Sequence, residues 1–213
     1  TTMTLKYEQS HYDALNLIFN VCQRLAFPMR TFTTACLYFH TFYEKGNDDE
    51  SLHNPSDIAL AAILVASKTE ETYRRIREIL QAAVIIAHPE LIEVNISEEE
   101  RARVVALEQS VLDAIQYDFC QRPCMFKMLM SIGKVELGSG RDTMNAAWNA
   151  LVKLHFKQNL ITKHPWIYLI MASLMHARTS LKKSTSKELD FCEKVFHLDM
   201  KTLSQVKAQL AAV

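Results

Sequence analysis

Residues 54–71 of this 213-residue chain read NPSDIALAAILVASKTEE. Asn54 offers a side-chain cap, Pro55 suits the first turn of a helix, and Asp57 places an acid near the positive end of the helix dipole. The residues of 58–66 are apolar on every side and rich in alanine. A helix that is apolar all round must be surrounded by other helices, and small residues let those neighbours come close. The stretch therefore predicts the central helix of a helical bundle.

Further helices are predicted on both sides of this segment. Apolar residues recur at steps of three or four along 10–25 and 32–43, which is helical spacing. After the central helix, a fourth helix is predicted over 73–87, and a capping box of Ser97 and Glu100 starts a fifth. The chain has only four glycines and five prolines, which favours long helices over many short strands.

The second half of the chain looks like a degenerate copy of the first. With an offset of 110 residues, four positions match in type: Pro55 with Pro165, Ala62 with Ala172, Leu64 with Leu174 and Lys68 with Arg178. The predicted fold is therefore all-α, with two five-helix bundles in tandem, the first over residues 1–122 and the second over residues 123–213.

Composition and motifs count against several classes of function. The formal net charge is zero, whereas a protein that binds nucleic acid through phosphate contacts usually carries a basic surplus. We find no glycine-rich nucleotide loop and no GxSxG, HExxH or kinase catalytic-loop motif, so we predict no catalytic residue and no cofactor. Cys120 and Cys124 are the only close cysteine pair, and no histidine follows them at zinc-ligand spacing, so no metal is predicted. The apolar runs are too short to span a membrane, and the odd cysteine count favours reduced thiols in an intracellular protein.

Three motifs resemble those of a known family. Residues 61–72 resemble the signature of the cyclin box, in which an alanine-rich third helix ends in Ala-(Ala/Ser)-Lys-x-Glu-Glu. The YFHTFY stretch of 38–43 is similar to the Tyr-x-His-Arg-Phe-Tyr of transcriptional cyclins, with Thr41 in place of the arginine. Residues 107–109, followed by 117–119, resemble the fifth cyclin-box helix with its glutamate and its aromatic-Asp-apolar ending.

The resemblance extends over 11–120 and, more loosely, over 125–213. It implies a non-catalytic regulatory subunit that binds and activates a cyclin-dependent serine/threonine protein kinase. In the family, the residues matching Lys68 and Glu108 hold the main chain next to the kinase's mobile regulatory helix. The other kinase-binding positions that the resemblance implies are Val65, Thr69, Leu112, Tyr117 and Phe119. Thr69 stands where many cyclins have a larger apolar residue, which departs from the cell-cycle pattern.

The histidine-containing second helix, the Phe27-Pro28 pair and the long spacer before the fifth helix favour the transcriptional branch. The sequence looks most like the cyclin subunit of the fungal kinase that phosphorylates the RNA polymerase II C-terminal domain (CTD), with cyclins K, T, L and C as alternatives. This implies a nuclear protein of transcription elongation that reaches the polymerase only through its kinase. It implies neither a membrane nor a direct nucleic-acid partner, and it leaves open which kinase is bound and whether a third regulatory subunit joins.

Other interpretations remain open at this point. A general initiation factor shares the tandem cyclin fold and grips DNA, and Arg74, Arg75 and Arg77 form one small basic cluster. A helical scaffold without a kinase is a second alternative, and an enzyme a third. Glu70 and Glu71 could form a catalytic carboxylate pair, but neighbours on a helix point about 100° apart, so a solvated helix end is predicted.

Overall fold

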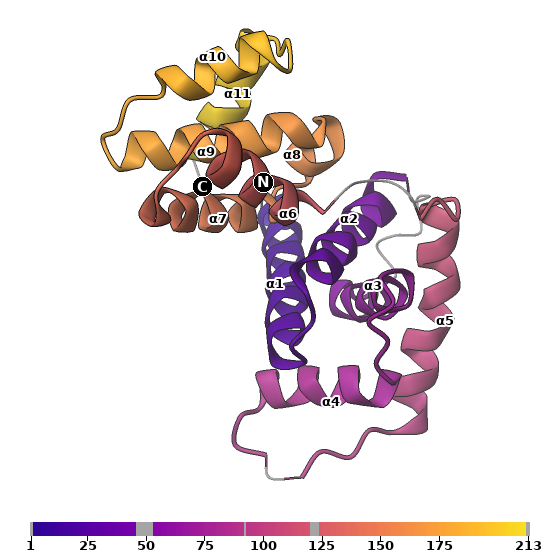
Figure 1. Ribbon diagram of the computed structural model, residues 1–213. Helices are drawn as coiled ribbons and strands as arrows, with labels where there is room; N and C mark the ends of the chain where they lie inside the picture. The colour runs from indigo at the N-terminus through magenta and orange to yellow at the C-terminus, as the bar shows by residue number, and fades with distance from the viewer. Residues whose placement is uncertain (1, 46–52, 92, 120–123, 212–213) are drawn as a thin grey trace. The chain divides into compact units, whose positions relative to one another are not determined.

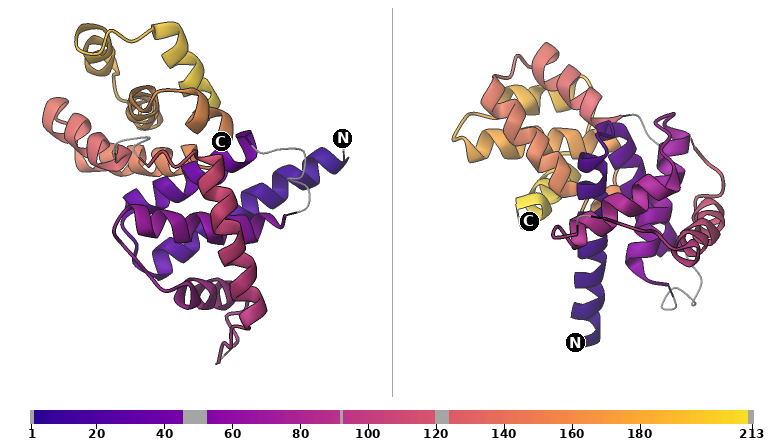
Figure 2. Two further views of the ribbon diagram at one scale, coloured as in Figure 1. Left: turned by 90° about the vertical axis from the view of Figure 1, so that its right-hand side faces the viewer. Right: turned by 90° about the horizontal axis from the view of Figure 1, so that it is seen from below.

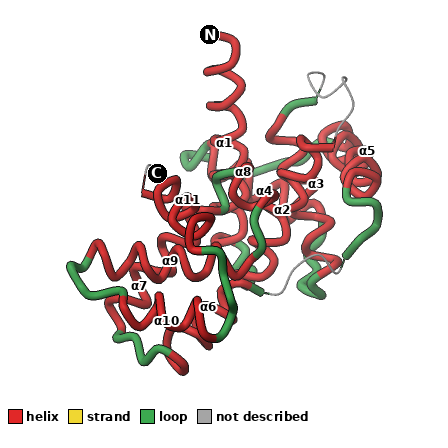
Figure 3. Tube along the Cα trace, turned by 90° about the horizontal axis from the view of Figure 1, so that it is seen from above, coloured by secondary structure: helices red, strands yellow, loops and turns green. Residues whose placement is uncertain are grey.

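The computed structural model describes residues 2–45, 53–91, 93–119 and 124–211. All regular structure in these ranges is helical, as the tube in Figure 3 shows, which confirms the predicted all-α class. The chain folds into two compact units, Thr1–Gln121 and Arg122–Val213.

Five helices make up the described part of unit 1 (Figure 1): α1 (Thr2–Arg24), α2 (Met29–Lys45), α3 (Pro55–Thr69), α4 (Ile76–Ala87) and α5 (Glu98–Ala114). Helix α3 packs against the other four, and every residue of 57–67 is buried. Figure 2 shows the same arrangement from two further sides. The prediction of an enclosed central helix is confirmed, whereas the predicted start of the first helix near Ser10 is wrong because α1 already begins at Thr2.

Both ends of α3 are fixed by local hydrogen bonds. At its start, the Asn54 side chain accepts a hydrogen bond from the Ser56 amide at 3.0 Å, and Pro55 occupies the first turn. At its end, the Glu71 amide donates to the Lys68 carbonyl and the Thr72 amide to the Ser67 carbonyl. This is a Schellman motif, and it holds Glu71 at a φ of 54°. These hydrogen bonds therefore fix the main-chain conformation of the last turn of α3.

Unit 2 contains α6 (Met125–Met130), which continues into a π-helical segment, η2 (Ser131–Glu136), and then α7 (Arg141–Leu154), α8 (Gln158–Lys163), α9 (Trp166–Ser180), α10 (Ser186–Lys194) and α11 (Met200–Ala211). Helix α9 has the central place in this unit, because it packs against α6, α7, α8, α10 and α11 (Figure 1). Its residues 169–175 are all buried. Helix α8 is a short element in the connection from α7 to α9.

The two central helices are alike in length and ending. Both α3 and α9 have 15 residues, and α9 also ends in a Schellman motif, in which the Lys183 amide donates to the Arg178 carbonyl. In this motif Arg178 takes the position of Ser67. The sequence pairing of Lys68 with Arg178 is therefore one residue out of register, since Pro165 precedes α9 whereas Pro55 lies inside α3.

Candidate functional site

A surface hollow of about 400 Å³ lies where the end of α3 meets α5. Its lining consists of Val65, Lys68, Thr69, Glu108, Leu112 and Phe119. These are six of the seven positions predicted to contact a kinase, so packing brings together residues that lie more than 50 positions apart in the sequence. The seventh, Tyr117, does not line the hollow.

Lys68 and Glu108 form an ion pair across the hollow. The Nζ of Lys68 lies 2.5 Å from Oε1 of Glu108 and donates a hydrogen bond to it. The lysine side chain is 45% exposed and that of the glutamate 19%. An ion pair this open contributes little to stability, about 0–1 kcal/mol. Both groups remain accessible, so either could exchange its present partner for a group on another protein.

The chain turns sharply at the end of α5, and after this turn Phe119 lines the hollow whereas Tyr117 does not. Gln116 and Tyr117 both have a φ of 55°. The Tyr117 hydroxyl donates to Asp113 at 3.1 Å and accepts from Nε2 of Gln109, so the ring lies back along α5. Phe119 reaches the hollow with 48% of its surface exposed. The hollow therefore offers an apolar floor beside one charged pair.

A second ion pair, which the sequence did not predict, joins α3 to α5. The Nε of Arg103 lies 2.7 Å from Oδ2 of Asp57, and its NH2 group lies 3.4 Å from Oδ1. Asp57 is only 8% exposed. Arginine binds a carboxylate in this two-pronged way with defined geometry, so the pair restrains how α5 crosses α3. No local motif marks it, because the two residues meet only after folding.

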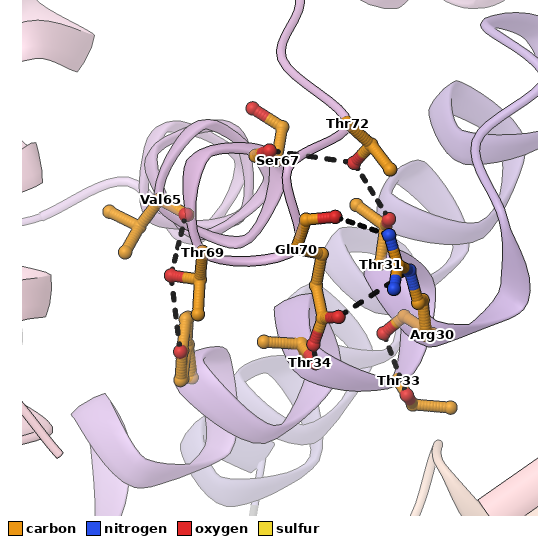
Figure 4. Close-up of polar contacts among 10 residues, drawn as sticks. Arg30, Thr31, Thr33, Thr34, Val65, Ser67, Thr69, Glu70 and Thr72 are labelled. Atoms are coloured by element: carbon orange, nitrogen blue, oxygen red, sulfur yellow. Dashed lines mark hydrogen bonds and ion pairs between the residues drawn. The ribbon is translucent and has the colours of Figure 1, made fainter. Parts of the chain in front are cut away.

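Glu70 links the end of α3 to α2 (Figure 4). Its Oε1 accepts a hydrogen bond from the Thr34 hydroxyl at 2.6 Å, and its Oε2 lies 3.6 Å from Nε of Arg30. Arg30 also donates to the Glu70 main-chain carbonyl at 2.6 Å. The prediction that this glutamate forms a solvated helix end is wrong, because its side chain is only 23% exposed and is engaged by α2.

Threonines extend this polar contact on both sides (Figure 4). The Thr72 hydroxyl bonds to that of Thr31 at 2.9 Å and reaches the Ser67 carbonyl at 3.5 Å. The Thr69 hydroxyl donates to the Val65 carbonyl at 3.0 Å and accepts from Tyr38 at 3.4 Å. Together with Glu70, these bonds fix the turn that carries Lys68.

In the described part of the chain, no group of histidines, cysteines and acids could hold a metal ion. Cys22, Cys36 and Cys192 are buried free thiols, and burial raises the pKa of Cys22 to about 12, so this thiol stays protonated and unreactive. Cys120 lies outside the described residues. None of the helices described is long and apolar enough to cross a membrane.

The fold is that of a cyclin-like protein. The structure superimposes on a chain of the crystal structure of the yeast RNA Pol II CTD kinase CTDK-1 complex with a TM-score of 0.79 and 18% identity, covering 98% of this chain and 66% of that one. It also matches a chain of the CAK complex from Chaetomium thermophilum bound to ATP-gamma-S, with a TM-score of 0.67 and 16% identity, covering 96% and 62%. At these identities the likeness establishes the fold alone.

The sequence identifies the family. The model of the cyclin N-terminal domain matches residues 5–120, more than half of the chain. The chain therefore belongs to the cyclin family, as the motifs predicted.

Two curated relatives come from Schizosaccharomyces pombe. CTD kinase subunit beta is 27% identical over 183 residues, covering 82% of this chain and 52% of the relative. Cyclin pch1 is 30% identical over 141 residues, covering 62% and 40%. The chain thus spans about half the length of the curated relatives that it matches. The predicted resemblance to a fungal CTD kinase subunit is confirmed.

Proposed function

We propose that this chain is a regulatory subunit that binds and activates a cyclin-dependent serine/threonine protein kinase through the hollow between α3 and α5. The observation that carries the proposal is the Lys68–Glu108 pair, partly open to solvent beside an apolar floor. It lies in a chain of the cyclin family whose fold matches chains of two kinase complexes.

The chemistry of the pair suits the capture of a helix end. A lysine ammonium offers only donors and a carboxylate only acceptors. Lys68 can bond to the free carbonyls of a partner segment, and Glu108 can receive its free amides. The N-terminus of a helix leaves its first amides without intrahelical partners, and the loop just before it can present free carbonyls, so both side chains find partners at that end. Leu112 and Phe119 then cover the apolar side of that segment, with Phe119 the more exposed of the two.

Activation follows from where the partner helix is held. A protein kinase is active when a glutamate of its mobile regulatory helix pairs with the lysine that positions ATP. A subunit that binds this inward arrangement better than the outward one shifts the population toward the active kinase. This chain then contributes binding energy and needs no catalytic residue of its own.

The relatives support a narrower proposal. Since CTD kinase subunit beta and a chain of the CTDK-1 complex are among the similar proteins, we infer that the bound kinase phosphorylates the RNA polymerase II C-terminal domain in transcription elongation. The chain would then act in the nucleus and reach the polymerase only through the kinase. A third regulatory subunit is compatible with this proposal, and unit 2, proposed as a C-terminal cyclin-like repeat, is one surface on which it could bind.

The test exchanges the two charges. The variant Lys68→Glu/Glu108→Lys keeps an ion pair across the hollow but reverses the groups offered to the kinase. The chain is used to capture kinases from native extract, and the captured kinase is assayed on a CTD peptide. Misplacing charges in a buried interface costs about 2–5 kcal/mol, so kinase recovery should fall about 30-fold or more while stability changes by less than about 1 kcal/mol.

A matched control exchanges a pair away from the hollow. Asp190 and Lys194 form an exposed pair on α10, 3.5 Å apart, and the variant Asp190→Lys/Lys194→Asp should capture and stimulate the kinase as the native chain does. Full kinase activity with the Lys68/Glu108 exchange would show that the interface lies elsewhere. Failure of the native chain to recover or stimulate any kinase would refute the proposed function itself.

A further inference from the structure

A basic surface follows directly after the end of α3. Arg74, Arg75 and Arg77 are all exposed, and Tyr73 beside them is 60% exposed. Arg74 and Arg77 are three residues apart along the chain, so their main-chain positions are at most about 11 Å from each other. Three guanidinium groups can therefore reach one doubly charged group. We call Tyr73, Arg74, Arg75 and Arg77 the arginine surface.

Within the described residues, none of these arginines takes part in an ion pair. Those pairs involve other basic residues: Arg30, Lys68, His88, Arg101, Arg103, Arg178 and Lys194. The nearby carboxylate of Glu70 is already engaged by Thr34 and Arg30. The arginine surface thus carries charge that the fold itself does not neutralise.

The start of this surface is held in place. The Thr72 side chain is bonded to Thr31 and Ser67, so the segment leaves α3 from a fixed point. Arg75 then has an extended conformation and is the N-cap residue, directly before the first residue of α4. Holding the main chain on both sides lowers the entropy lost when the side chains close on a ligand.

From these observations we propose that the arginine surface binds a phosphorylated serine or threonine segment of another protein. A phosphate monoester carries close to two negative charges and three acceptor oxygens, and arginine clusters recognise it by two-pronged hydrogen bonds. The Tyr73 ring adds an apolar face against which the peptide can pack. This function goes beyond kinase activation and requires no kinase.

The extent of the surface favours a peptide over nucleic acid. Glu71 and Glu78 stand on either side of it in the sequence, and the whole chain has no net charge. A nucleic-acid interface spreads phosphate contacts along a longer basic stripe. Three arginines between two acids match one or two phosphate groups.

The test titrates the full chain with a short fluorescent peptide that carries two phosphoserines and, separately, with the same peptide unphosphorylated. We expect the phosphorylated peptide alone to bind, with an affinity that falls as salt is raised. The variant Arg74→Glu/Arg75→Glu/Arg77→Glu should bind both peptides equally weakly. The milder Arg75→Gln should lower the affinity about fivefold, the largest effect typical of one exposed ion pair.

The control variant Lys182→Glu/Lys187→Glu/Lys201→Glu changes the net charge equally at exposed residues of unit 2 and should bind as the native chain does. Circular dichroism checks that each variant folds, and Arg75→Gln decides the matter if the triple arginine variant does not. Equal binding of both peptides by the native chain would overturn the proposal, as would equal loss in both triple variants. Duplex DNA that binds more tightly than the phosphopeptide at the same salt would also overturn it.

Discussion

The substitution Glu70→Gln tests whether the end of α3 is anchored to α2 by charge. Glutamine keeps the size of the side chain and can still accept from Thr34, but it carries no charge. Two losses follow. The attraction to Arg30, at 3.6 Å between side chains that are 47% and 23% exposed, is worth about 0.5 kcal/mol. The 2.6 Å bond from Thr34 changes from a charge-assisted to a neutral one, which removes about 1 kcal/mol.

The expected loss of stability is therefore about 1.5 kcal/mol. For a protein of 150–250 residues this lowers the melting temperature by about 3–6 °C, measured by circular dichroism. The matched control is Glu71→Gln, the same substitution one residue further along at an exposed position. It should change stability by less than about 0.5 kcal/mol.

Equal melting temperatures for the two variants would refute the reasoning, because the substitution then acts without regard to the contacts with α2. A second reading comes from the mutation Thr34→Val, which removes the donor but leaves the charge. If the Thr34–Glu70 bond contributes to stability, the losses of stability in Thr34→Val and in Glu70→Gln should sum to more than the loss in the double variant, since both substitutions disrupt the same contact.

Three further predictions test other parts of the structure. Glu71→Gly should raise stability by about 1 kcal/mol in thermal melts, because φ at this position is 54° and glycine adopts such values without strain; no gain would contradict the Schellman ending. Gly133→Ala should destabilise unit 2 by about 1–3 kcal/mol, since the new Cβ would lie 2.6 Å from Sδ of Met144, and tryptophan fluorescence, which reports on unit 2 alone, measures it. His11 packs against the Tyr43 ring, and burial lowers its pKa to about 4 from an ordinary 6.5. Between pH 4 and 6.5 the unfolded chain therefore binds more protons at His11 than the folded chain does. The contribution of the neutral histidine to the free energy of unfolding is complete above pH 6.5, and about 1–2 kcal/mol of it is lost as the pH drops toward 4. An unchanged pH dependence in His11→Phe would contradict this.

The sequence predicted the fold well where local signals and burial agree. In the segment of 54–71, Asn54 and Pro55 predict where the helix begins, and the unbroken apolar run predicts that it is buried. The observed bounds of α3 agree with these signals to within a residue or two. The start of α1 was misplaced because Ser10 and Asp13 form a weak capping signal inside a longer helix. A helix continues through a cap-like pair when nothing interrupts its hydrogen bonds.

The candidate site was predicted from motifs rather than from physics. Periodicity alone placed Lys68 and Glu108 on two helices, and the family resemblance paired them. Packing of α3 on α5 then brought Nζ to within 2.5 Å of Oε1. The Asp57–Arg103 pair and the Thr34–Glu70 bond escaped prediction, because each joins residues far apart in sequence and depends on how the helices cross.

One short motif at the end of α3 performs two tasks because of helical geometry. Successive residues of a helix are rotated by about 100° around its axis. Two residues therefore correspond to about 200°, which places the side chains of Lys68 and Glu70 on nearly opposite sides. Lys68 consequently faces the hollow and α5, while Glu70 turns the other way and is held by Thr34 and Arg30 of α2. The contact of Glu70 with α2 restrains the turn, and Lys68 on the other side therefore presents its ammonium group at a fixed place. A change at Glu70 should therefore weaken kinase binding without touching the interface, by loosening the turn on which Lys68 stands.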